Sequence, residues 1–78
     1  YSPYYFSRVF KKETNMSPYE YLINRRINHA KHLLITTNEP ISSISELCGY
    51  NSTIHFSNSF KKLVGMTPSE YRKKYQQT

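Results

Sequence analysis

Apolar residues recur at spacings of three and four along most of this chain, a pattern typical of amphipathic helices. The longest apolar stripe predicts a helix from Ser17 to about Thr36, and its members are Leu22, Ile23, Ile27, Ala30, Leu33 and Leu34. Shorter stripes predict helices over residues 1–14, 41–48, 52–64 and 68–75. The sequence lacks the period-two alternation of a half-buried strand, so we expect an all-α fold.

The shorter stripes also indicate which residues we expect to pack in the hydrophobic core. In the first predicted helix these are Phe6, Val9 and Phe10. In the helix over residues 41–48 they are Ile41, Ile44, Leu47 and Cys48. In the next helix they are Phe56, Phe60, Leu63 and Val64. The four phenylalanines could instead stack on single-stranded bases, but their helical spacing favours core packing.

One segment of the chain occurs twice, at Ser2–Tyr21 and Ser52–Tyr71, with an offset of 50 residues. The identical pairs are Ser2/Ser52, Phe6/Phe56, Ser7/Ser57, Phe10/Phe60, Lys11/Lys61, Lys12/Lys62, Met16/Met66, Pro18/Pro68, Glu20/Glu70 and Tyr21/Tyr71. A solenoid needs three or more copies, and two copies indicate a tandem pair of similar modules instead.

Both copies carry the same signals for the end of one helix and the start of the next. Gly65 is expected to end a helix in a left-handed conformation, and Asn15 is a tolerable substitute at the matching position. Thr67–Glu70 and Ser17–Glu20 both read as capping boxes with proline at the first helical position. Each copy is therefore predicted to contain a helix, a stop and a new helix.

The second copy lies within a predicted helix-turn-helix. Residues 41–48 form its first helix, Gly49 supplies a sharp turn, and Ser52 caps its second helix. We expect this unit to be nearly self-contained, because its apolar residues can bury one another: Ile41, Ile44, Leu47, Tyr50, Phe56 and Phe60.

Charge narrows the choice of partner. The 78-residue chain carries a net charge of +6, with a pI of about 9.6, and its last helix holds the basic run Arg72, Lys73 and Lys74. This balance favours an anionic partner. An acidic membrane surface is the rival, but no apolar run approaches the length of a membrane span and no signal peptide is visible. The single cysteine excludes an internal disulfide, which favours a reducing cytoplasm.

Candidate chemistry is sparse. His29 and His32 are three residues apart, but no acidic or cysteine residue lies nearby at a spacing that would complete a metal site. Cys48 falls on an apolar helix face, as a small core residue does. Paired carboxylates, a glycine-rich phosphate loop and a Ser-His-Asp pattern are all missing from the sequence. We therefore predict no enzyme activity, no metal and no cofactor.

The segment from Ile41 to Arg72 resembles the signature of the AraC/XylS family of bacterial transcriptional regulators over its second helix-turn-helix. The segment from Tyr21 to Leu34 is similar to the central helix of that family. The resemblance covers the whole chain. It implies two helix-turn-helix units, in homeodomain-like three-helical lobes, that are joined by the long helix and read two adjacent major-groove segments of DNA.

Carried over by position, the resemblance implies that bases are read by Tyr4, Ser7, Arg8, Thr53, Ile54, Ser57 and Asn58. We expect phosphate contacts from Ser2, Lys11, Lys12, Ser52, Lys61 and Lys62. The two Lys-Lys pairs could be a solvated face, but their repetition beside each reader helix favours phosphate contact. Asn58 stands where the first copy has Arg8, so the second unit is expected to have fewer cationic contacts.

The resemblance also implies a division of the chain. Residues 1–16 would hold the recognition helix of an incomplete first unit, residues 17–38 the linker helix, and residues 39–78 the second lobe with its C-terminal helix. The family domain has further helices before the position of Tyr1, so we expect that the start of the domain is missing here.

The expected partner is double-stranded operator DNA, with RNA polymerase and an effector or receiver domain of a full-length protein as further partners. A module that docks another protein subunit is the alternative. Salt-dependent binding to duplex DNA distinguishes the two classes.

Overall fold

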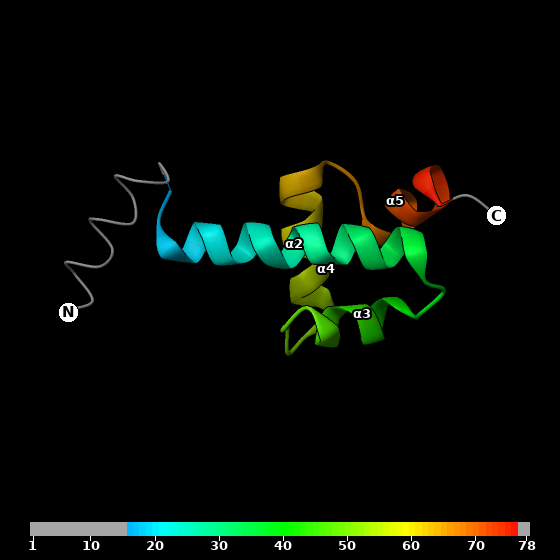
Figure 1. The fold of residues 1–78 in the computed structure, drawn as a ribbon, viewed down its shortest axis with the longest axis horizontal. Coiled ribbons are helices and arrows are strands. Elements are labelled where there is room, and N and C mark those ends of the chain that lie inside the picture. The colour runs from blue at the N-terminus through cyan, green and yellow to red at the C-terminus, as the bar shows by residue number, and fades with distance from the viewer. Residues whose placement is uncertain (1–15, 77–78) are drawn as a thin grey trace.

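The computed structural model describes residues 16–76, where four helices follow one another and no residue lies in a strand (Figure 1). The helices are α2, Pro18–Thr36; α3, Ile41–Leu47; α4, Thr53–Val64; and α5, Pro68–Tyr75. The all-α prediction is confirmed, and each helix begins and ends close to the predicted residues. The helix predicted over residues 1–14 lies outside the described residues, together with Phe6, Val9, Phe10 and Asn15.

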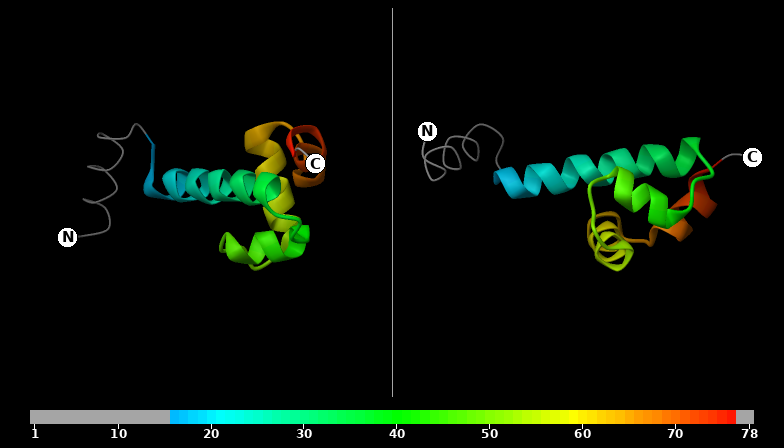
Figure 2. Two further views of the ribbon diagram at one scale, coloured as in Figure 1. Left: turned by 45° about the vertical axis from the view of Figure 1, so that its right-hand side comes forward. Right: turned by 90° about the horizontal axis from the view of Figure 1, so that it is seen from below.

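The three shorter helices gather around the C-terminal half of α2, and the N-terminal half of α2 extends beyond them (Figure 1). Figure 2 shows the same projection of α2 from two further directions. α4 crosses α2, and α2 contacts α3, α4 and α5. The C-terminal half of the central helix is therefore part of the lobe.

The core of this lobe is built from α2, α3, α4 and the turn between α3 and α4. α2 contributes Ile27, Ala30 and Leu34, and the other buried members are Ile44, Cys48, Tyr50, Phe56 and Phe60. Tyr71 of α5 packs against the cluster from outside. The helix-turn-helix unit is expected from its sequence to be nearly self-contained. Four of its six expected core residues are buried together, and α2 adds three further residues to the same cluster.

Three leucines that the stripes placed inside are largely exposed: Leu22 at 44%, Leu47 at 60% and Leu63 at 47%. Leu22 precedes the part of α2 that the other helices cover. Leu47 lies to the side of the core-facing residues of α3, and Leu63 lies on the flank of α4. An apolar stripe on a helix can be wider than the strip that its neighbours cover, so periodicity overestimates burial at the edges.

Two of the helix starts follow the predicted capping pattern. Thr67 Oγ1 accepts from the N–H of Glu70 at 3.2 Å, and the Glu70 carboxylate accepts from the N–H of Thr67 at 2.9 Å. These hydrogen bonds lower the pKa of the Glu70 carboxyl. At Ser17 only the hydroxyl half of the predicted box forms, with Oγ accepting from the N–H of Glu20 at 3.1 Å. Gly65 ends α4 with a φ of 92°, as predicted.

The end of α2 is held by side chains from α5. Arg72 donates from Nε to the carbonyl oxygen of Leu34 and from Nη2 to that of Thr37, both at 3.2 Å. Gln76 donates to the same two oxygens, at 3.3 and 2.8 Å. The last turn of α2 has no basic residue of its own, so the guanidinium supplies the positive charge that a helix C-terminus favours. Arg72 is thus a structural clamp and not part of a free basic run.

Candidate nucleic-acid interface

α3 and α4 form the predicted helix-turn-helix. Gly49 adopts a φ of 90°, a conformation that costs little only for glycine. The N–H of Tyr50 donates to the carbonyl oxygen of Ser45 at 2.9 Å, and Ser45 Oγ lies 3.4 Å from Thr53 Oγ1. Ser45 is buried, so these polar contacts join the two helices inside the unit. They fix the direction in which α4 leaves the turn.

One side of α4 is anchored and the other faces solvent. Phe56 and Phe60 are fully buried, with ring centroids 5.9 Å apart. On the opposite side, Ile54 is 75% exposed. This outward face of α4 consists of Ile54, His55, Asn58, Lys61 and Lys62, all of them exposed. An exposed face on a helix that is fixed from behind can insert into a groove without rearranging the core.

The other predicted contacts of the second unit lie at the edge of this face. Thr53 and Ser57 are half-buried, and the Thr53 hydroxyl is turned toward Ser45. Ser52 is exposed, but its Oγ accepts from the N–H of His55 at 3.3 Å as the cap of α4. The hydroxyls of Ser52 and Thr53 therefore serve the helix start in this structure. Their predicted contacts with DNA stay predictions.

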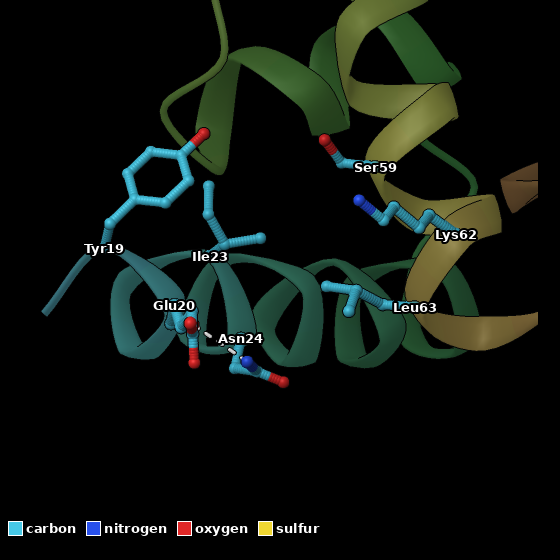
Figure 3. A pocket seen from close by; sticks show the side chains of 7 residues that line it. All are labelled: Tyr19, Glu20, Ile23, Asn24, Ser59, Lys62 and Leu63. Carbon is cyan, nitrogen blue, oxygen red and sulfur yellow. Dashed lines mark hydrogen bonds between the residues drawn. The ribbon is translucent and has the colours of Figure 1, made fainter. Parts of the chain in front are cut away.

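The two adjacent lysines point in different directions. The charge of Lys61 makes a minor contribution to the lowered pKa of Glu70, which places it toward the start of α5. Lys62 borders a hollow of about 370 Å³ between α4 and the N-terminal half of α2 (Figure 3). The residues around this hollow are Tyr19, Glu20, Ile23, Asn24, Ser59, Lys62 and Leu63. Both lysines thus belong to the outward face of α4, with Lys61 nearer to α5 and Lys62 nearer to α2.

Comparison with known proteins places this geometry in a family. A family model described as a helix-turn-helix domain matches residues 1–74. The chain belongs to this AraC-type helix-turn-helix family. The resemblance of Ile41–Arg72 to the AraC/XylS signature is therefore confirmed. The chain spans about a quarter to a third of the length of curated transcriptional regulators that it matches.

Solved structures of AraC-type domains share the arrangement. The C-terminal domain of AraT, a response regulator from Geobacillus stearothermophilus, is 38% identical with a TM-score of 0.97, over 99% of this chain and 64% of that one. The AdpA DNA-binding domain, solved in complex with a target DNA, is 30% identical with a TM-score of 0.87, over 90% and 63% of the two chains. An AraC-type regulator from Chromobacterium violaceum is 34% identical with a TM-score of 0.85, over 91% and 63%.

The structure adds residues that sequence reasoning missed. His55 is exposed in the first turn of α4, three residues before Asn58 and on the same face. Helical spacing alone could have identified it. Arg26 contacts the turn of the helix-turn-helix from α2, and no local pattern indicates this. The six site residues predicted in the first unit lie outside the described residues: Ser2, Tyr4, Ser7, Arg8, Lys11 and Lys12.

Residues 16–76 give little support for a metal site, a reactive thiol or a membrane-spanning helix. That part of the chain has no cluster of three or more His, Cys, Asp or Glu residues that could hold a metal ion. Cys48 is buried, and burial raises the pKa of its thiol, which disfavours the reactive thiolate. None of the helices described is long and apolar enough to cross a membrane.

Proposed function

We propose that this AraC-type chain binds double-stranded DNA sequence-specifically, as the DNA-binding part of a bacterial transcription regulator in the cytoplasm. The observation that carries the proposal is the outward face of α4. It presents polar and apolar side chains together with two lysines, on a helix that the core holds rigidly. An α-helix fits the major groove, where residues near its N-terminus reach base edges.

α2 supports the further proposal that two adjacent major-groove segments are read. Its 19 residues make it about 28 Å long. Successive major grooves on one face of DNA recur about every 34 Å. A helix of this length can hold two units near that spacing, and DNA bending at a cost of a few kcal/mol could absorb the difference.

RNA polymerase and an upstream sensing or receiver domain are proposed as further partners on the resemblance alone.

Selection from a library of randomised duplexes tests the proposal directly. The 78-residue chain is expected to enrich a defined site, and its affinity for that site should fall steeply as salt is raised. Binding without enrichment would leave only a nonspecific cationic surface. If neither enrichment nor salt-dependent binding were seen, the alternative of a protein-docking module would take the place of the proposal.

The lysines of α4 should contribute to affinity on every sequence. Replacing Lys61 or Lys62 by alanine should lower the slope of log K against log salt by about one unit, because each variant removes one phosphate contact. The matched controls are Lys73→Ala and Lys74→Ala, which remove the same charge from α5. Equal slopes in all four variants would show that the α4 lysines make no specific phosphate contact.

Asn58 should contribute to sequence preference. Asn58→Ala is expected to weaken binding to the selected site by about 1–3 kcal/mol and to relax the preference at one base position, because an amide reads adenine in the major groove. Asn28→Ala, an exposed asparagine on α2, is the control. Repeating the selection with both variants gives the answer, and an unchanged base preference for Asn58→Ala would remove it from the set of readers.

A further inference from the structure

The turn between α3 and α4 is contacted by a side chain from the central helix. The guanidinium carbon of Arg26 lies 5.6 Å from the ring centroid of Tyr50. A Cβ atom placed on Gly49 would lie 3.1 Å from Arg26 Nε and 3.2 Å from Cζ and Nη2. The guanidinium therefore packs close to the glycine backbone, and a Cβ at this position would require the guanidinium to shift by a few tenths of an ångström. Arg26 is half-buried in this contact.

Tyr50 transmits this contact to the first turn of α4. Its ring lies edge-on to His55 at 5.6 Å and to Phe56 at 5.4 Å between centroids. His55 belongs to the outward face of α4, and Phe56 to its buried face. These contacts thus connect Arg26, through the Tyr50 ring, to the first turn of the helix that is proposed to read DNA.

The electrostatics of the turn agree with this packing. The positive charge of Arg26 opposes the burial that raises the pKa of the Cys48 thiol, so the guanidinium is close to the end of α3 as well as to Tyr50. Arg25, the next residue along α2, is exposed and lies 6.0 Å from the ring of Tyr21 on the same helix. Two neighbouring arginines therefore differ in their contacts, although they carry the same charge.

We propose that Arg26 is a positioning residue for DNA reading. It sets the direction of α4 through Gly49 and Tyr50, so that base preference depends on a side chain of the central helix that does not itself read a base. This inference rests on the proposed DNA binding. A readout of this kind needs side chains held within about 0.5 Å and 10–20° of the productive geometry. The planar guanidinium has a fixed fork of donors and a cation–π contact with the Tyr50 ring, a geometry that a lysine ammonium does not reproduce.

The test compares Arg26→Ala, Arg26→Lys and Arg25→Ala in the 78-residue chain. Each is titrated against the duplex selected by the unaltered chain, and against duplexes with single base changes at the positions assigned to α4. Arg26→Ala should reduce discrimination between these duplexes about tenfold, which corresponds to about 1.4 kcal/mol. Arg25→Ala should weaken binding to all duplexes alike and leave discrimination unchanged.

Arg26→Lys separates positioning from charge. It keeps the charge and should still lose most of the discrimination. If Arg26→Ala fails to fold, as judged by circular dichroism, the lysine variant decides the question. Full discrimination in Arg26→Lys, or equal losses in Arg25→Ala and Arg26→Ala, would overturn the inference.

The failure of this inference is distinguishable from failure of the proposed function. If the unaltered chain selects no duplex, the proposed DNA binding fails first. The backbone amide chemical shifts of residues 49–55 then test the positioning directly. Arg26→Ala should move these resonances and Arg25→Ala should not. Unmoved resonances in Arg26→Ala would show that the guanidinium does not orient the turn.

Discussion

Phe60→Ala is expected to destabilise the lobe by about 3–5 kcal/mol, the usual cost of removing a fully buried phenylalanine. Phe60 is completely inaccessible to solvent and packs its ring against Phe56 and against Tyr71, whose centroid is 5.5 Å away. The substitution therefore removes apolar burial and leaves a cavity where α4 meets α5. A small domain has a total stability of about 5–15 kcal/mol, so this variant should lose a large share of it.

Urea denaturation followed by circular dichroism measures this loss, with Leu63→Ala as the matched control. Leu63 lies on the same helix but is about half exposed, so its replacement should cost less than about 1 kcal/mol. The sequence alone placed both residues on the buried face. Similar losses for the two variants would contradict the placement of α4 described above.

Arg72→Ala is expected to cost about 3 kcal/mol, although Arg72 looks like a surface charge in the sequence. Its guanidinium donates two hydrogen bonds to the carbonyl oxygens of Leu34 and Thr37. Hydrogen bonds from charged groups contribute about 1.5–3 kcal/mol each. Gln76 still reaches both oxygens, so the loss should be smaller than the sum of the two bonds.

Lys73→Ala and Gln76→Ala complete this experiment. Lys73 is exposed on α5, and its replacement should leave the urea midpoint nearly unchanged. Arg72→Ala combined with Gln76→Ala should cost more than the two single losses together, because only the double variant leaves both oxygens without a donor. Losses that simply add would mean that the two side chains do not share these acceptors.

Phe60→Ala and Arg72→Ala also indicate which positions should be used to study DNA binding. Phe60 and Arg72 hold α4 and α5 against α2, so their replacement should weaken binding by destabilising the lobe. A loss of binding in such variants carries no information about contacts with DNA. Exposed positions such as Asn58 and Lys62 report on recognition because the core does not depend on their side chains.

Much of the local structure follows from the sequence because its causes are local. The hydroxyl of Thr67 and the carboxylate of Glu70 are three residues apart, so their reciprocal hydrogen bonds need only one helical turn. The left-handed φ of Gly65 is likewise a property of one residue, and no atom lies within 4 Å of a Cβ placed there. Helix bounds, helix ends and the helix-turn-helix are therefore readable along the chain, as is Ile54 as an outward residue.

Only the tertiary structure decided which neighbours each helix meets. Leu47 and Leu63 have the right period for a core but stay about half exposed, because the period identifies a helix face and not how much of that face its neighbours cover. The clamp of Arg72 on Thr37 joins residues 35 positions apart. The packing of Arg26 on Gly49 depends in the same way on how the helices fold back on one another. Contacts at such distances along the chain leave no spacing pattern, so the sequence determined the elements and their ends, and packing determined which charged side chains are structural.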